Sequence, residues 1–396
     1  MKKLLLVLVL IMSFAGCKKA VEDPKGSVIE VLEDAGAHAI LLATGDVYIE
    51  NNDTLTKVPT SDVKQIAKWH GELWMVKNNG ELVVKDGFGK EAPYVYAGLS
   101  KVEKVVMGRG NEKFAIMQDG KLFDLDSFAE IEVKNVVDVV EFGTGSFIAL
   151  TKKGELWGWG KNISAHNILS QSGVAEVTKP VKIPIKKVQK LYSSKEIALA
   201  LCKNGDLYVW GGHSALQQCA DDIMGHVNKP KRIYRKVADV HMQTAYNNQD
   251  FSYAAILLKN GTVEVLAGYD QIPVDGLSDI AKIYGDGAAI YAVSKTDELI
   301  IRGHSRVMDA SKLGGIKNIT PPTNTKSSFY EGNVFFNTKD GWYMLDHAQL
   351  GAGFQRVLGL FEPPYISTDN TAWISDSEYI YRIDNGMVTP LSPLQP

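Results

Sequence analysis

The sequence predicts an all-β protein: a β-propeller of about nine repeat units that follows a short amino-terminal leader. Three observations predict this fold. A pattern of three strands with a tight turn recurs from residue 28 to residue 396. The strands in it are rich in β-branched and aromatic residues, which favour sheets. The chain also has 36 glycines against 14 prolines, which is typical of many tight turns.

We predict that the amino-terminal segment is an export signal followed by a short polar tether. Two lysines precede the apolar run Leu4 to Met12, which is shorter than the roughly 20 residues that a helix needs to cross a bilayer. Cys17 follows two small residues, so the segment resembles the lipobox of bacterial lipoproteins. We therefore expect a signal peptide at residues 1–16, a lipid on Cys17 and a polar lipidated tether at residues 17–27. An ordinary signal peptide with an incidental cysteine is the alternative.

Each repeat unit begins with a strand of the type V-x-x-V, and two more apolar strands joined by a turn follow it. The clearest copies are FIALTKKGELWGWG from Phe147 and IALALCKNGDLYVWG from Ile197. The predicted starts of the nine units are Val28, Val63, Val102, Val136, Val188, Val237, Ile280, Ile316 and Val357. We expect residues 28–396 to form eight or nine blades, with seven as an alternative.

Most units place a glycine in the turn between their second and third strands, where a positive φ costs it little. The turn glycines are Gly45, Gly80, Gly120, Gly154, Gly205, Gly261 and Gly341. The flanking strands are almost continuously apolar, as expected for strands buried on both faces. One unit of about 40 residues cannot cover both of its own faces, so stacking around an axis is predicted.

The pattern A-L-x-x-x-G-x-L-x-x-W-G, at residues 149–160 and 200–211, resembles the repeat of the regulator of chromosome condensation family. The resemblance is strongest over residues 136–236 and implies a propeller, usually of seven blades. The loop after Trp-Gly departs from the family's Asn-x-x-Gly-Gln-Leu-Gly. The family includes exchange factors for a nuclear GTPase, which does not fit an exported lipoprotein. It also includes secreted bacterial inhibitors of β-lactamases, but none of their contact residues carries over to this sequence.

The charge balance argues against one class of partner. The chain has 43 basic and 46 acidic residues, for a formal net charge of −3. Such a balance gives no global field to attract nucleic acid or an anionic membrane. We therefore expect no nucleic-acid partner, and we expect membrane association through the lipid anchor.

Catalytic and metal-binding motifs are absent from the sequence. It lacks a phosphate-binding loop, an H-E-x-x-H helix, a C-x-x-C pair and a G-x-S-x-G elbow. His213 and His304 occupy equivalent places, but two histidines on separate units do not make a metal site. A disulfide between Cys202 and Cys219 stays open, and no basic partner marks either as a nucleophile. We expect no catalytic residue, no metal and no cofactor.

Two basic segments, at residues 179–190 and 229–236, occupy equivalent places in adjacent units. Equivalent places in a propeller lie on one rim, so we expect one patch that docks an acidic protein surface, or lipid or polysaccharide phosphates. The candidate partner-binding cations are Lys182, Lys186, Lys187, Lys231, Arg232 and Arg235. Solvated lysines that discourage pairing at an outer strand are the alternative.

The two longest links between strands, residues 161–187 and 212–236, are candidate binding loops, because a propeller holds such loops rigidly. Interfaces need apolar anchors. The candidate apolar anchors in these loops are Ile163, Leu169, Leu216 and Met224.

Together these features predict a non-enzymatic lipoprotein, anchored in the bacterial envelope at the outer membrane, whose propeller holds an unidentified envelope or extracellular protein. The alternative is a carbohydrate- or small-ligand-binding protein, or an enzyme, with a site in the central channel. A channel site predicts acids or histidines that line one funnel, whereas a scaffold predicts an exposed patch on a rim. A third hypothesis is a structural assembly factor within a membrane complex.

Overall fold

The computed structural model describes the central part of the chain and most of its blades. The described residues are 27–89, 91–108, 110, 112–142, 145–162, 169, 174–194, 197–212, 216, 225–245, 250–267, 274–285, 289–303, 313, 315–320, 333–346, 354–367, 371–375, 379–384 and 387–393. The predicted signal peptide, Cys17 and nearly all of the tether lie outside them, so those predictions stay predictions.

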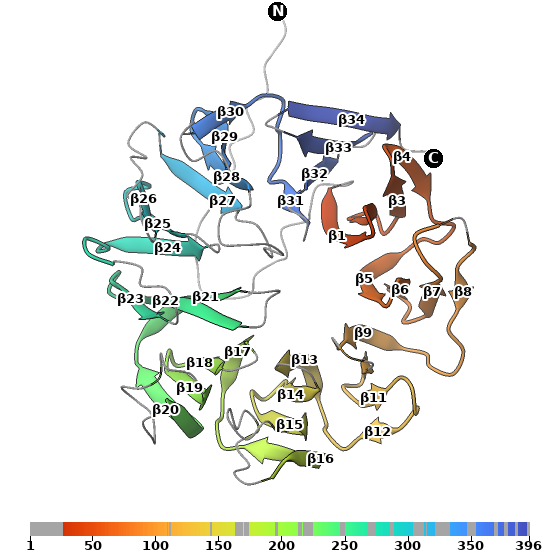
Figure 1. The fold of residues 1–396 in the computed structure, drawn as a ribbon, viewed down its shortest axis with the longest axis horizontal. Coiled ribbons are helices and arrows are strands. Elements are labelled where there is room, and N and C mark those ends of the chain that lie inside the picture. Colours follow the sequence, from red (N-terminus) through yellow and green to blue (C-terminus); the bar gives the residue numbers. More distant parts are fainter. Residues whose placement is uncertain are drawn as a thin grey trace, which may run out of the picture.

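The described residues form a nine-bladed β-propeller (Figure 1). Within them, 34 strands pair into nine antiparallel sheets, and each sheet is built from strands that are consecutive in sequence. The sheets follow one another around a common axis, with the first strand of each sheet innermost (Figure 1). The prediction of an all-β propeller is confirmed, and nine is the observed number of blades.

Blades 1 to 5 each have four described strands. In chain order these are β1 Val28–Asp34, β2 Ala37–Leu42, β3 Val47–Asn51 and β4 Thr54–Lys57; β5 Val63–Trp69, β6 Glu72–Lys77, β7 Leu82–Lys85 and β8 Tyr94–Val95; β9 Val102–Met107, β10 Lys113–Met117, β11 Leu122–Asp124 and β12 Glu130–Ile131; β13 Val136–Phe142, β14 Ser146–Thr151, β15 Leu156–Lys161 and β16 Glu176–Ile183; β17 Val188–Ser193, β18 Ile197–Cys202, β19 Leu207–Gly212 and β20 His226–Tyr234.

Blades 6 and 7 have three described strands each, and blades 8 and 9 have four. These are β21 Val237–Ala245, β22 Asp250–Leu258 and β23 Val263–Ala267; β24 Ile280–Gly285, β25 Ala289–Ser294 and β26 Leu299–Gly303; β27 Ile316–Thr320, β28 Asn333–Thr338, β29 Gly341–Asp346 and β30 Phe354–Val357; β31 Tyr365–Ile366, β32 Ala372–Ser375, β33 Tyr379–Asp384 and β34 Met387–Pro393.

The second strand of a blade is the most buried. Every position of β2, β14, β18 and β25 is buried. A strand inside a sheet that neighbouring blades cover on both faces has no solvent side, so its sequence is apolar without alternation. Aromatic side chains fill the space between blades. For example, the ring of Trp159 in blade 4 lies 5.7 Å from that of Phe114 in blade 3.

The predicted turn glycines take the backbone conformation that the sequence suggests. All seven have a positive φ, between 76° and 123°. In blade 7 the equivalent place is held by Asp297, with a φ of 63°. Aspartate is among the few side chains that tolerate this region, which explains why that unit can lack the glycine.

The predicted start of the ninth unit is wrong. Val357 ends β30, the outer strand of blade 8, where it pairs with Trp342. Blade 9 begins instead at β31, whose Tyr365 pairs with Trp373. Val357 and Leu360 are both buried and have the spacing of a V-x-x-V motif. Here, however, that spacing joins an outer strand to a link and does not form an inner strand.

Where blades 9 and 1 meet, the described residues make several side-chain contacts. A buried cluster packs Tyr48 of blade 1 with Trp373 of blade 9. Beside it, Nδ1 of His38 lies 2.9 Å from Oε2 of Glu50, and Nη1 of Arg382 lies 3.8 Å from Oε1 of Glu50. The two ends of the described chain are therefore held together by apolar packing and a buried charged group.

Candidate functional site

The ring has two unlike faces, because antiparallel strands alternate in direction. At one face the first strands begin and the described turns between second and third strands lie; we call it the turn face. Its turns are short, as at residues 152–155. The opposite face, which we call the loop face, holds the connections from third to fourth strands. The two long ones, residues 162–175 and 213–225, follow the ends of β15 and β19 there.

Backbone hydrogen bonds join neighbouring blades along the turn face. Val102, which begins blade 3, donates its N–H to the carbonyl of Gly80 in the turn of blade 2, at 2.9 Å. The residue before it, Lys101, accepts a bond at 2.9 Å from the N–H of Gln118 in the next turn. We call this pair of bonds the backbone latch. It recurs at each described junction from blades 1 and 2 to blades 7 and 8.

The backbone latch gives the turn glycines a second role that the sequence analysis missed. A β-carbon on Gly80 would lie 2.5 Å from the Cα of Lys101, and one on Gly154 would lie 2.6 Å from the carbonyl oxygen of Val188. The glycine therefore allows close approach of two backbones as well as a positive φ. The residue that it approaches varies in type, so no side-chain signal marked the contact. These residues are Asp62, Lys101, Asn135, Lys187, Lys236 and Asp279, all with positive φ.

The latches gather the predicted cations on the turn face of blades 4 to 6. Val188 N donates to Gly154 O at 3.0 Å, which joins the turn of blade 4 to the link at residues 186–187. Lys203 N donates to Lys187 O at 2.9 Å, and the same pattern continues through blade 6. The exposed cations of these segments form what we call the basic rim. It consists of Lys152, Lys153, Lys186, Lys187, Lys203, Arg235, Lys236 and Lys259.

Two predicted contact residues are engaged within their own blades. Lys182 Nζ lies 2.6 Å from Oε1 of Glu155, and Arg232 Nη1 lies 3.3 Å from Oδ2 of Asp206. The hydrogen bond from Lys182 lowers the pKa of Glu155, so this carboxylate stays charged and paired. Both acids directly follow a turn glycine, at equivalent places in blades 4 and 5. Pairing neutralises them and leaves the basic rim positive.

The other predicted cations divide between the rim and the outer edge. Lys186, Lys187 and Arg235 belong to the basic rim and are exposed. Lys231 is exposed on the outer strand β20, opposite Val209, away from the turns.

The long connection after β15 is fixed to its blade at both ends. Asn162 donates its backbone N–H to Ala175 O at 2.8 Å and its side-chain Nδ2 to Val174 O at 2.9 Å. Its Oδ1 accepts the N–H of Leu169 at 3.3 Å. Leu169 is fully buried next to Gly158, where a β-carbon would lie 2.9 Å from Cδ2 of the leucine. The hydrogen bonds of Asn162, which we call the clamp, and the buried side chain of Leu169 therefore fix this connection to its blade.

The prediction of a partner contact is wrong for two of the four apolar anchors. Leu169 and Leu216 are both 0% exposed and belong to the core cluster of blades 4 to 6. Burial of apolar surface is favourable by about 25 cal/mol per Å², so these side chains fill the blade beneath the loop and do not face solvent. The other two anchors, Ile163 and Met224, lie outside the described residues.

The structure describes one of the two cysteines of the candidate disulfide. Cys202 is a free, buried thiol, and burial raises its pKa, with a smaller contribution from Asp206. Cys219 lies outside the described residues.

The structure therefore separates the two halves of the predicted site. Lys182 pairs with Trp157 near the turn-face end of β15, whereas Lys161, at the other end, opens the long connection. A strand of this length spans about 17 Å. The rim cations and the described ends of the long connections therefore lie at opposite faces of blades 4 and 5.

Polar contacts join the inner strands around the axis. Gln65 donates its Nε2 to Val105 O at 3.0 Å and accepts Val105 N–H at 2.9 Å. Lys104 lies 2.5 Å from Asp138 of the next blade. The third residue of the V-x-x-V motif is polar in eight units, a readable signal that the sequence analysis missed. These residues are Glu30, Gln65, Lys104, Asp138, Lys190, Asp239, Lys282 and Asn318.

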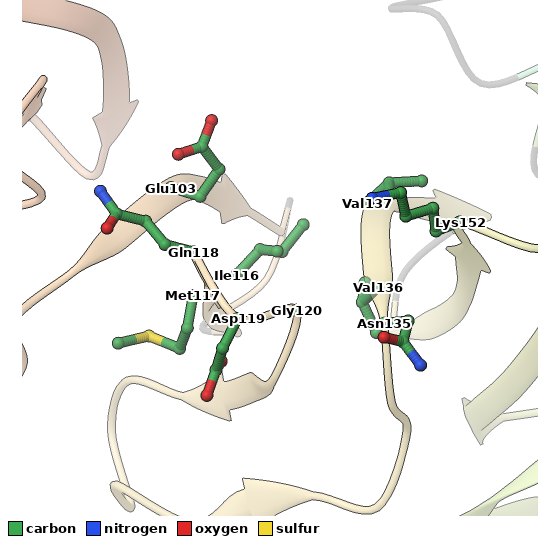
Figure 2. A pocket seen from close by; sticks show the side chains of 10 residues that line it. All are labelled: Glu103, Ile116, Met117, Gln118, Asp119, Gly120, Asn135, Val136, Val137 and Lys152. Atoms are coloured by element: carbon green, nitrogen blue, oxygen red, sulfur yellow. The ribbon is translucent and has the colours of Figure 1, made fainter.

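A pocket of about 420 Å³ opens between blades 3 and 4. Figure 2 shows Gln118 and Asp119 of the blade 3 turn on one side, with Asn135 and Lys152 across the space. The pocket adjoins the basic rim because Lys152 belongs to both. It lies between two blades, so it differs from the channel funnel that the alternative function predicts.

The described part of the chain holds neither a candidate metal cluster nor a candidate membrane-spanning helix. No cluster of three or more His, Cys, Asp or Glu side chains suited to a metal ion occurs among the described residues. Within that part, no helix has the length and apolar character needed to cross a membrane. His213 and His304 lie outside it.

Comparison with known proteins gives distant similarities. No protein-family model matches the chain. A Rho GTPase-activating protein, gacGG, from Dictyostelium discoideum is 38% identical over 72 residues, which is 17% of this chain and 6% of that protein. The match thus spans a small part of the relative's length, and the similarity assigns no activity to this chain.

Among solved structures, Prp20p from Saccharomyces cerevisiae, which is yeast RCC1, is 14% identical with a TM-score of 0.44. That alignment covers 74% of this chain and 80% of Prp20p. BamB from Moraxella catarrhalis is 12% identical with a TM-score of 0.39, and the alignment covers 84% of each chain.

Proposed function

We propose that this chain is a non-enzymatic, lipid-anchored scaffold of a bacterial envelope, and that its loop face holds a protein partner. The supporting observation is the division of the ring into two faces. Tight turns and backbone latches close the turn face. The loop face carries the long connections of blades 4 and 5, and the first of these is clamped at both ends by Asn162 and plugged by Leu169.

The clamp matters because ordering a loop costs free energy at the moment of binding. A connection that is already tied to its blade presents its outer residues with less of that cost. Propellers commonly bind through loops inserted on one face for this reason. The buried leucines therefore serve the partner site indirectly, by positioning the loop above them.

The partner site is tested by loosening the clamp without changing the surface of the loop. Asn162→Ala removes two side-chain hydrogen bonds, which join the start of the connection to Val174 and to Leu169. We expect capture of a partner from envelope extract by crosslinking to fall about tenfold, since a freed loop must be reordered on binding. The control is Asn204→Ala, an exposed asparagine in a turn on the opposite face. Equal capture by both variants would move the partner site elsewhere.

The lipid anchor is tested separately. Cys17→Ser removes the predicted acyl chains, whose burial would contribute about 0.8 kcal/mol per CH₂. We expect the variant in the soluble fraction, while the parent protein stays with membranes that have been washed in high salt. Retention of the variant on salt-washed membranes would contradict lipidation at Cys17.

A small-ligand site is the second candidate function, and the pocket between blades 3 and 4 supports it. The pocket mixes carboxylate, amide and ammonium groups, which suits a small polar ligand. Gln118→Trp would fill it. A ligand that raises the melting temperature of the parent protein, but not of this variant, would establish the site.

A further inference from the structure

We infer that the basic rim binds the anionic headgroups of the bilayer that holds the lipid anchor, so that the turn face lies on the membrane and the loop face points away from it. The ligand is the phosphodiester group of an anionic phospholipid. The inference deepens the proposed function and rests on its lipid anchor. Two observations carry it: the face at which the chain enters the propeller, and the charge of that same face.

The chain enters the propeller at the turn face. Ser27 O accepts the N–H of Ala43, at 2.8 Å, in the turn between β2 and β3 of blade 1. β1 then begins at Val28 and runs toward the loop face. Residues 18–26 lie between Cys17 and this point, and a fully extended chain covers about 3.5 Å per residue. The anchor thus holds the turn face within about 35 Å of the bilayer surface.

The basic rim and the entry point lie on the same face but at different blades. The chain enters at blade 1, whereas the rim covers blades 4 to 6, on the far side of the axis (Figure 1). Because the rim extends over three blades, the rim and the entry point together restrain the tilt of the ring on a bilayer. The anchor also keeps the rim at a high local concentration near the lipid surface, where even weak contacts are occupied.

The charge of the rim suits headgroup phosphates. Its exposed lysines and arginine sit on short turns, and the nearby acids Glu155 and Asp206 are already paired. Two other acids on this face are also paired, Asp46 with Lys57 at 3.5 Å and Asp279 with Lys295 at 3.2 Å. The whole chain has a formal net charge of −3, so an anionic surface repels the protein unless the rim faces it.

These observations favour a membrane over an acidic protein as the occupant of the rim. The lipid anchor would bring this face to a bilayer whether or not a partner is present. A basic patch together with one lipid anchor is also a recurrent two-signal design for stable membrane association. Each cation near an anionic surface adds a small and salt-sensitive increment to binding.

The test uses the soluble Cys17→Ser chain, so that binding reports the rim and not the lipid. Co-sedimentation is measured with vesicles of phosphatidylglycerol and phosphatidylcholine in equal parts, and with phosphatidylcholine alone. We expect binding to the mixed vesicles only, and we expect added salt to weaken it. Binding to both kinds of vesicle alike, or to neither, would overturn the inference.

A matched pair of variants locates the contact. Lys186→Glu with Arg235→Glu reverses two equivalent rim positions in adjacent links and spares the residues with positive φ. Lys179→Glu with Lys229→Glu makes the same charge change at equivalent exposed positions of the outer strands β16 and β20. We expect the rim variant to bind mixed vesicles at least about tenfold more weakly, and the outer-strand variant to bind almost as the parent does.

Equal losses in the two variants would mean a general charge effect and would overturn the inference. So would a rim variant that keeps vesicle binding but loses a crosslinked protein, since the rim would then dock a protein. Lipid anchoring is measured independently, as the amount of Cys17→Ser protein retained on salt-washed membranes. A failed anchor with intact vesicle binding, and the reverse, are therefore distinguishable results.

Discussion

The contacts described at the junctions between successive blades differ from those described where the ring closes. From blade 1 to blade 8, each described junction repeats the backbone latch, as Val102 and Gly80 show. At the closing junction the described contacts are made by side chains. His38, Glu50 and Arg382 form a buried charged group, and the ring of Trp373 lies 4.9 Å from that of His38.

These contacts show how a divergent repeat protein can stay closed. A backbone latch needs a glycine, or a residue that tolerates positive φ, and otherwise accepts any side chain. Sequences between the blades can therefore diverge without loss of the contact. The closing junction occurs once and joins distant parts of the chain, so it depends on particular partners. A buried charged group suits that role, because an incorrect pairing would leave a charge without a partner.

Breaking a backbone latch should destabilise the protein most. Gly80→Ala adds a β-carbon that would lie 2.5 Å from Lys101 Cα at a φ of +84°. We expect a loss of about 2–4 kcal/mol in the free energy of unfolding. Gly36→Ala is the control, because Gly36 has a φ of +85° but no neighbouring atom within 4 Å of the added carbon. It should lose only about 1 kcal/mol, and similar losses in denaturant titrations of the two variants would refute the latch.

A smaller loss of stability is expected when the contacts of the closing junction are weakened. Glu50→Gln keeps the size of a nearly fully buried side chain but removes the charge that faces His38 and Arg382. Hydrogen bonds to a charged group contribute about 1.5–3 kcal/mol. We therefore expect a loss of about 2 kcal/mol, measured by thermal unfolding near neutral pH. An unchanged melting temperature would show that the apolar cluster alone closes the ring.

The closing junction should also respond to acid. Burial alone would raise the pKa of Glu50, but hydrogen bonds from His38 and the Asp53 N–H, with the charges of His38 and Arg382, lower it below 4.5. A depressed pKa stabilises the fold above the unfolded value, and this contribution is lost as pH falls through the folded value. Below about pH 4.5 the parent protein should lose stability more steeply than Glu50→Gln. Parallel pH profiles would contradict this.

The smallest change in stability is expected at the inner strands, where Glu30 and Gln65 make related contacts. Glu30 of blade 1 accepts Ile66 N–H at 3.2 Å, whereas Gln65 of blade 2 makes two bonds to Val105. Burial raises the pKa of Glu30, against lowering by the Ile66 hydrogen bond and the charge of Lys104, so ionised Glu30 costs stability near neutral pH. Glu30→Gln should then stabilise the protein by about 0.5–1 kcal/mol.

For Glu30 the expected dependence on pH has the opposite sign to that of Glu50. Because its folded pKa is raised, the parent protein recovers stability as pH falls and Glu30 takes up its proton. The advantage of Glu30→Gln should therefore shrink on acidification. The reverse exchange, Gln65→Glu, is the control and should destabilise near neutral pH.

Much of the fold could be predicted from the sequence, because turns and buried strands leave local signals. The seven turn glycines and the first eight unit starts follow from such signals. The ninth start failed because Val357 and Leu360 mimic the spacing of an inner strand, and only the pairing with Trp342 shows otherwise. Leu169 failed for a related reason, since an apolar residue in a long link gives no sign of whether it faces the core or solvent.

The repeat, its turn glycines and the cations of blades 4 to 6 can be recognised from the amino-acid sequence, because each depends on residues close together in the chain. The assembly of the ring places the cations on the turn face, while the long connections leave from the loop face. It also brings Glu50 and Arg382 together where the ring of nine blades closes. The physical reason is that strand direction and blade stacking, which are properties of the assembled sheets, set the face to which each residue belongs.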